Sequence, residues 1–292
     1  MNIGLSQNDR FRETPEAVTA QETLAKGFPA GAAEPTVVLT TPDRVDRVVG
    51  QLQGVDGVAS VRPGPASETR AQLDVVLSSE RGSEQSSDTI KAIRAELSDT
   101  ELVGGPDAQD LDSRSATIND FTLIAPLVLA CVLLILLLLL RSVVAAIVLV
   151  LTVVATYVSA IGLGWFISEH LFGFPALDLG VPLFAFIFLV ALGVDYNIFL
   201  TTRAREEART QPVAGAMTTA LAVTGGVITS AGILLASVFA VLGVLPLIML
   251  TQVGIIVGLG VLLDTLVVRS LLVPALATLL GERFWWPGRP KP

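Results

Sequence analysis

Two ionisable residues, Asp195 and Tyr196, stand side by side within the segment GVDYNIFL. Between Asp178 and Arg203 the only charged residue is Asp195, so its carboxyl group lies among aliphatic and aromatic neighbours. A carboxylic acid within an apolar span is typical of proton or ion pathways, and it normally faces the interior of a helix bundle. Tyr196 can donate a hydrogen bond to a carboxylate or help to relay a proton. The pair therefore indicates proton transfer.

A second pair, Asp264 and Arg269, lies five residues apart toward the end of a later apolar run. Its spacing leaves open a structural ion pair, an interfacial cap or a role in coupling. Asp195 also has a structural alternative, in which polar side chains of a neighbouring span satisfy its carboxyl group. The candidate partners for that role are Thr224, Thr229 and Ser230.

Other kinds of chemistry have little material in this chain. It contains one cysteine, Cys131, and one histidine, His170. No internal disulfide is possible, and a Cys/His metal cluster or a Ser-His-Asp triad has little material to work with. We expect no enzyme activity, no metal and no cofactor.

Five long apolar stretches must position the two ionisable pairs. The composition is 52% hydrophobic and only 16% charged, which is unusual for a soluble protein. About 20 apolar residues are needed to cross a bilayer as a helix. Five stretches qualify, at about 121–140, 143–167, 180–201, 223–242 and 247–273. Small residues let such helices approach closely, and the candidates for helix packing are Gly193, Gly225, Gly226, Gly254 and Gly258.

Residues 36–105 show a different pattern, in which short strand-like and helical segments alternate. The order βαββαβ predicts a small ferredoxin-like α/β domain. The predicted organisation is a helix and loop lead-in at 1–35, the α/β domain at 36–115, a five-helix transmembrane domain at 116–280 with a surface helix near 203–217, and a tail at 281–292.

Charge predicts the orientation in the membrane. Residues 1–120 carry 11 basic and 20 acidic groups, which argues against nucleic acid as a partner. All eight basic residues of the apolar part lie at connections or ends on one side, and such residues favour the cytoplasm. We therefore expect a multi-pass protein of the plasma (inner) membrane, with residues 1–120 extracytoplasmic and the tail cytoplasmic. The start, MNIGLSQNDRFRET, has no apolar core, so we expect a preceding repeat to be missing or encoded separately.

The segment GVDYNIFL, followed by TTRAREE, resembles the Asp-Tyr motif of the MMPL family in the resistance-nodulation-division (RND) superfamily. The segments LLLRSVVAAIVLVLTVV and LLDTLVVRSLLVPAL are similar to helices of the same family, and the opening residues resemble the start of its second external domain.

The resemblance implies the C-terminal half of a proton-driven exporter of lipids or hydrophobic small molecules, with an external porter domain. Asp195 and Tyr196 would be its proton relay, and membrane lipid, protons and an N-terminal repeat its partners. An accessory RND-type protein that aids protein translocation and an inactive truncated transporter are the alternatives. An oligomer is left open.

Overall fold

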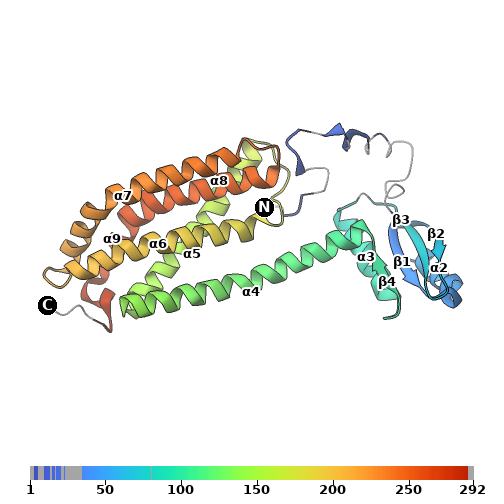
Figure 1. Cartoon of the computed structure of the whole chain (residues 1–292), viewed down its shortest axis with the longest axis horizontal. Helices are drawn as coiled ribbons and strands as arrows, with labels where there is room; N and C mark the ends of the chain where they lie inside the picture. The colour runs from blue at the N-terminus through green and yellow to red at the C-terminus, as the bar shows by residue number, and fades with distance from the viewer. Residues whose placement is uncertain are drawn as a thin grey trace. The chain divides into compact units, whose positions relative to one another are not determined.

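The computed structural model describes residues 35–79 and 81–288, together with residues 3–5, 10–13, 15, 16, 18–20 and 23. Most of the predicted lead-in at 1–35 lies outside the described residues. The chain forms two compact units, Gly4–Asn119 and Asp120–Pro292 with Met1–Ile3 (Figure 1). Each unit is described by itself below.

The unit Gly4–Asn119 contains a four-stranded antiparallel sheet with the strand order β2-β3-β1-β4. Two helices are interleaved with these strands, one between β1 and β2 and one between β3 and β4. In chain order the elements are β1 (Thr36–Thr40), η2 (Pro42–Arg44), α2 (Val45–Gln53), β2 (Val58–Ala66), β3 (Ala71–Leu77), α3 (Glu84–Glu96) and β4 (Leu102–Gly104).

Local sequence explains these elements. Alternate residues of β1 are buried, as expected for a strand with one face on a core. The helix α3 begins after Ser83, whose hydroxyl accepts a hydrogen bond from the backbone N–H of Ser86 at 3.1 Å. The core between sheet and helices is aliphatic, with Val38, Leu52, Leu73, Val75, Ile90 and Ile93 fully buried.

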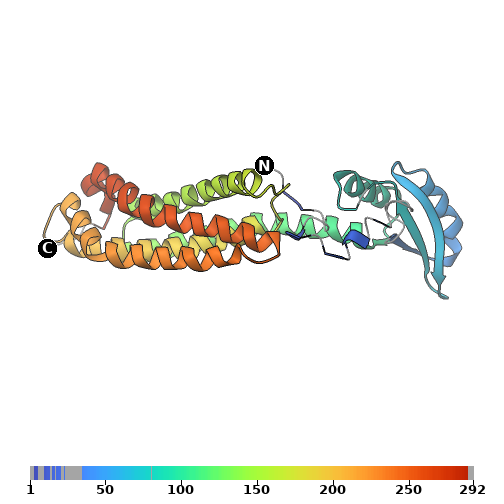
Figure 2. The same ribbon diagram turned by 90° about the horizontal axis from the view of Figure 1, so that it is seen from above.

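Among the described residues, five helical segments are long and apolar enough to cross a membrane, which supports a multi-pass membrane protein. The five segments follow one another along the chain, and the second to the fifth lie side by side within the unit Asp120–Pro292 (Figures 1 and 2). They are α4 (Pro106–Leu140), α5 (Val143–His170), α6 (Val181–Glu207), α7 (Val213–Leu242) and a last, composite helix. The composite helix consists of α8 (Ile248–Leu263), the π-helix η3 (Asp264–Leu272) and α9 (Val273–Leu280), and the 3-10 helix η4 (Gly281–Trp285) follows it.

The structure has no separate surface helix at 203–217. Instead, the charged segment continues α6 to Glu207, and α7 begins at Val213. The side chain of Arg203 explains the continuation, because it pairs with Glu206 at 2.9 Å and Glu207 at 2.5 Å along the same helix. Pairs at these spacings stabilise a helix, so α6 extends beyond its apolar part.

Close helix contacts occur at some of the five glycines and not at others. A Cβ atom at Gly254 would lie 2.5 Å from the carbonyl oxygen of Phe239, so α7 and α8 approach closely there. Gly258 also faces α7, whereas a Cβ atom at Gly193 would be in ordinary contact with Val153 of α5. At Gly226 it would have no heavy atom within 4 Å, and at Gly225 it would meet only the side chain of Leu221, on its own helix.

Candidate functional site

The helix α6 directs its two adjacent ionisable residues to different surroundings. Successive residues of an α-helix point about 100° apart. Tyr196 is partly buried against the aliphatic core of the bundle, whereas Asp195 is exposed. The carboxyl group thus does not face the interior of the helices in this chain, which differs from the expectation for an acid within a membrane span. No described hydrogen bond or ion pair reaches it.

The face of α6 that carries Asp195 is otherwise aromatic and aliphatic. Phe184, Phe188 and Phe199 are exposed and lie 11 and 7 residues before Asp195 and 4 residues after it. These spacings place all four side chains on one face of the helix. Exposed apolar groups are ordinary on a membrane helix, but the carboxyl group among them is not.

On the interior side, Tyr196 contacts a buried cation. The guanidinium carbon of Arg269 lies 4.5 Å from the centroid of the Tyr196 ring. The same guanidinium donates a hydrogen bond to the carbonyl oxygen of Gly193 at 3.3 Å and forms an ion pair with Asp264. The Arg269 side chain is only 1% exposed. Arg269 therefore links η3 to the turn of α6 that holds Asp195 and Tyr196.

The π-helix explains how Asp264 and Arg269 can pair. Five residues in an α-helix correspond to about 500° of rotation, which separates the side chains by about 140°. A π-helix closes its hydrogen bonds between residues five apart, so it brings these two side chains onto one face. Pro274 follows in α9 and has no N–H for a regular α-helical bond to residue 270, which favours an irregular turn before it.

Sequence reasoning missed Asn197, a fully buried residue of α6. It lies four residues after Gly193, so it is on the same face of α6 as Gly193, whose carbonyl oxygen accepts the hydrogen bond from Arg269. Neither its amide oxygen nor its amide nitrogen has a hydrogen-bond partner among the described residues. The same is true of Asp264 Oδ1, Thr265 Oγ1 and two of the three nitrogens of the Arg269 guanidinium, Nε and Nη1. An amide directly after the Asp195-Tyr196 pair, within an apolar span, was the signal that could have found it.

The three polar residues considered as partners of Asp195 bond elsewhere or do not reach it. The hydroxyl of Thr224 donates to the carbonyl of Ala220 at 2.8 Å, and that of Ser230 donates to Val227 at 3.0 Å. Both bonds lie within α7. No described hydrogen bond joins Thr229 to Asp195 either.

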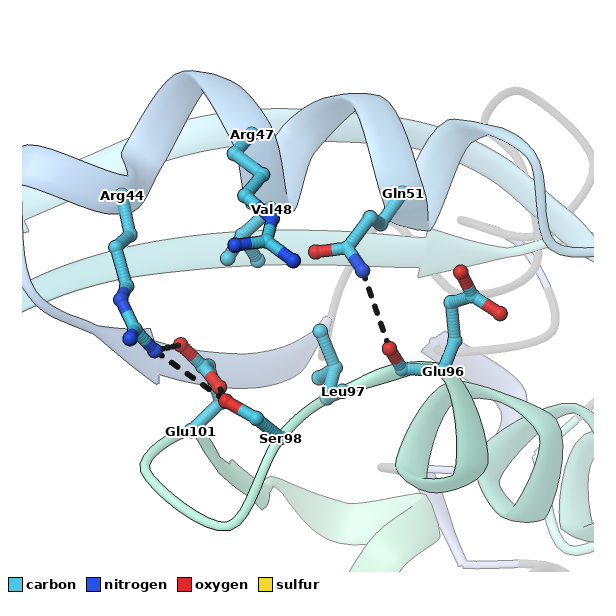
Figure 3. A pocket seen from close by; sticks show the side chains of 8 residues that line it. All are labelled: Arg44, Arg47, Val48, Gln51, Glu96, Leu97, Ser98 and Glu101. Atoms are coloured by element: carbon cyan, nitrogen blue, oxygen red, sulfur yellow. Dashed lines mark hydrogen bonds and ion pairs between the residues drawn. The ribbon is translucent and has the colours of Figure 1, made fainter.

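The unit Gly4–Asn119, the α/β unit, contains a polar pocket of about 180 Å³ between α2 and the connection from α3 to β4 (Figure 3). Its main contact is an ion pair between Arg44 and the buried carboxylate of Glu101 at 3.1 Å. Arg44 also donates to the hydroxyl of Thr100 at 2.7 Å, and Gln51 donates to the carbonyl of Glu96 at 3.2 Å. Side chains that line the pocket thus connect η2 and α2 with α3 and the segment that follows it.

The hydrogen bond from the Ser98 hydroxyl and the nearby Arg44 lower the pKa of Glu101 to about 2, against the opposing effect of burial. The carboxylate is therefore ionised at neutral pH and holds the connection before β4 in place. Among the described residues no group of three or more His, Cys, Asp or Glu side chains could hold a metal ion.

Comparison with known proteins identifies the family. The model of the MMPL family matches residues 15–291. The SCO0839 protein of Streptomyces coelicolor is 45% identical over 301 residues, which cover 98% of this chain and 43% of the relative. The apo-petrobactin exporter of Bacillus anthracis is 40% identical over 64% of this chain and 25% of its own length. The acyltrehalose exporter MmpL10 of Mycobacterium tuberculosis is 44% identical over 47% of this chain and 14% of its own length.

The match to the family begins before β1 and extends beyond the last helix. The chain spans less than half of the length of each of these relatives. Two of them are named as exporters. The chain belongs to the MMPL family of membrane proteins.

Proposed function

We propose that this chain is the C-terminal, proton-coupled half of a membrane exporter of lipids or hydrophobic small molecules. The observation that carries the proposal is Asp195, an acid on an open face of a membrane helix, backed by Tyr196 and the buried Arg269. Asp195 would accept a proton from one side of the membrane and release it to the other. The driving force is about 2.3 kcal/mol per charge per 100 mV.

The open face of α6 supports a partner for this chain. An acid at the centre of a membrane helix costs about 2.5–3.5 kcal/mol when lipid surrounds it. We therefore infer that further helices, supplied by an N-terminal repeat, cover Asp195 and its phenylalanine neighbours in the assembled protein. The length of the relatives, more than twice the region that this chain matches, is consistent with such a repeat.

Arg269 and Asp264 are suited to couple the proton to helix movement. Protonation of Asp195 removes a negative charge beside Tyr196, and Arg269 is the cation held against the ring of that tyrosine. A change in the position of Arg269 would act on η3 through Asp264. Because π-helical turns are frequent at functional sites, we assign the shift to η3. The orphaned polar atoms of Asn197 and Thr265 would offer hydrogen bonds to such a shifted arrangement.

The α/β unit would be the external porter domain of this exporter. Its strand order β2-β3-β1-β4, with every neighbour antiparallel, supports a ferredoxin-like fold. The basic residues at one end of the helices support a cytoplasmic position for that end and an extracytoplasmic position for the α/β unit. The substrate class rests on two relatives, whose names specify apo-petrobactin and acyltrehalose.

The test is transport by this chain co-expressed with the remaining part of a full-length relative and reconstituted into vesicles. An imposed proton gradient should drive movement of a fluorescent acylated glycolipid, and Asp195→Asn should abolish it while leaving membrane insertion intact. Glu169→Gln is the matched control, because Glu169 is an exposed acid in the same unit and lies at the end of α5.

Proton-driven transport that persists in Asp195→Asn would contradict the relay. If every variant is inserted but none transports, and if the α/β unit binds unfolded polypeptide, the accessory role in protein translocation would be favoured instead. No transport and no such binding would favour an inactive transporter.

A further inference from the structure

Three arginines meet at the end of the bundle where α4 ends and α5 begins. Arg141 follows α4, Arg205 lies in the last turns of α6, and Arg209 lies two residues beyond that helix. Arg205 and Arg209 are four residues apart, about one helical turn. Arg205 donates to the carbonyl oxygen of Gly288, and a Cβ atom at Gly288 would clash with the carbonyl oxygen of Arg141. Arg141, Arg205 and Arg209 are named the arginine cluster below.

The segment after α9 fixes the backbone around this cluster. The hydroxyl of Ser142 donates to the carbonyl oxygen of Phe284 at 2.7 Å, and the backbone N–H of Val143 donates to Trp286 at 2.9 Å. Arg205 donates to the carbonyl oxygen of Gly288 at 2.9 Å, which ties α6 to the same segment. The start of α5, the end of α6 and the chain after α9 therefore converge at one point (Figure 1).

Nearby acids do not neutralise the cluster. Glu206 and Glu207 lie in the same part of α6, but both pair with Arg203. Among the described residues no ion pair reaches Arg141, Arg205 or Arg209. One nitrogen of Arg205, Nη1, is buried without a hydrogen-bond partner in the described part of the chain. The cluster thus combines three positive charges with an unused donor.

Like charges held close together repel one another unless an anion lies between them. The cluster lies where membrane helices end, which is the depth of lipid headgroups. Guanidinium groups bind phosphate oxygens through paired, charge-assisted hydrogen bonds. The exposed Trp286 beside the cluster is also typical of the membrane–water interface. We propose that the arginine cluster binds the phosphate group of an anionic membrane lipid.

The general preference for basic residues at cytoplasmic helix ends does not account for this arrangement. That preference requires only positive charge in a connection. Here one arginine of the same connection, Arg203, is neutralised by two acids, whereas three arginines from two connections converge without a counter-charge. This site does not depend on transport, so it can be tested whether or not the proposed export is found.

The test uses the full chain in phosphatidylcholine bilayers with increasing phosphatidylglycerol that carries brominated acyl chains. Bromine quenches nearby tryptophans, and a Trp165→Phe background leaves Trp285 and Trp286 beside the cluster as reporters. We expect quenching by the anionic lipid at lower mole fraction than by brominated phosphatidylcholine. Arg141→Gln and Arg209→Gln should each lower this selectivity about ten-fold, since a hydrogen bond to a charged group is lost.

Arg283→Gln is the control, because it removes the same charge from an exposed arginine at the same end of the bundle but outside the cluster, and it should leave the selectivity unchanged. Arg141 and Arg209 are exposed, so an unaltered tryptophan emission spectrum will show that their variants fold. Equal selectivity in all variants, or an equal loss in Arg283→Gln, would overturn the proposal. Displacement of the brominated lipid by inorganic phosphate at millimolar concentration would assign the cluster to soluble phosphate and overturn the lipid assignment.

Discussion

Arg269 lies over the aromatic ring of Tyr196, with the guanidinium carbon 4.5 Å from the ring centroid. The two residues are 73 positions apart in the chain. Their contact places a buried cation behind the tyrosine, while the neighbouring Asp195 points away from it, to the exposed face of α6. Tyr196 and Arg269 therefore lie between the exposed Asp195 and the buried Asp264.

Removal of the Arg269 charge should destabilise the helical unit strongly. Arg269→Gln would leave the buried Asp264 without its cation, which costs about 3–5 kcal/mol in the free energy of unfolding. The double variant Asp264→Asn with Arg269→Gln should regain most of that loss, because no unpaired charge remains. Titration with SDS in mixed micelles, followed by tryptophan fluorescence, measures both. A double variant as unstable as the single one would show that the ion pair is not the cause.

Two substitutions of Tyr196 should separate its packing from its hydroxyl. Tyr196→Leu removes the ring under Arg269 and should lower the free energy of unfolding by about 1–2 kcal/mol. Tyr196→Phe keeps the ring and should change stability little, but we expect a partial loss of proton-driven transport. The same SDS titration and the vesicle assay provide the two readouts. Full transport by Tyr196→Phe would remove the hydroxyl from the proposed relay.

The contact between α7 and α8 should be sensitive to one glycine and tolerant at another. Gly254→Ala puts a methyl group 2.5 Å from the Phe239 carbonyl and should cost about 1–3 kcal/mol. Gly226→Ala, which meets no heavy atom within 4 Å, should be neutral or stabilise the helix by up to about 1 kcal/mol. Unfolding in mixed micelles distinguishes them, and equal effects would contradict the described packing of α7 on α8.

The α/β unit should lose stability in acid through Glu101. Its pKa of about 2 in the folded state lies below the ordinary value of 4.5, so the stabilisation is complete above about pH 4.5 and is lost as the pH falls toward 2. The shift corresponds to roughly 3 kcal/mol at most. Pepsin cleavage within residues 36–105 of the full chain, compared between wild type and Glu101→Gln, should show a difference at pH 4.5 that shrinks toward pH 2.

Glu96→Gln is the control for this experiment, because Glu96 lines the same pocket but is exposed. The comparison at each pH cancels the pH dependence of the protease itself. A difference between wild type and Glu101→Gln that stays constant from pH 4.5 to pH 2 would contradict the lowered pKa.

The five membrane spans could be predicted because they depend on length and composition alone. A run of about 20 apolar residues has few alternatives to a membrane helix. The strands and helices of residues 36–105 could also be predicted, since short strand-like and helical segments alternate there between turn residues. The chemistry of Asp195 and Tyr196 was readable from their types and their apolar surroundings. The extent of α6 was not, because it depends on ion pairs of Arg203 within the helix.

Which way each side chain faces was decided by the tertiary structure. On a helix that is apolar all round, lipid and neighbouring helices offer similar surroundings, so the sequence does not mark the inner face. The outward direction of Asp195, the burial of Asn197 and the convergence of the arginine cluster followed only from packing. The pairing of Asp264 with Arg269 needed a π-helix, whose extra residue per turn brings together side chains that an α-helix would hold apart.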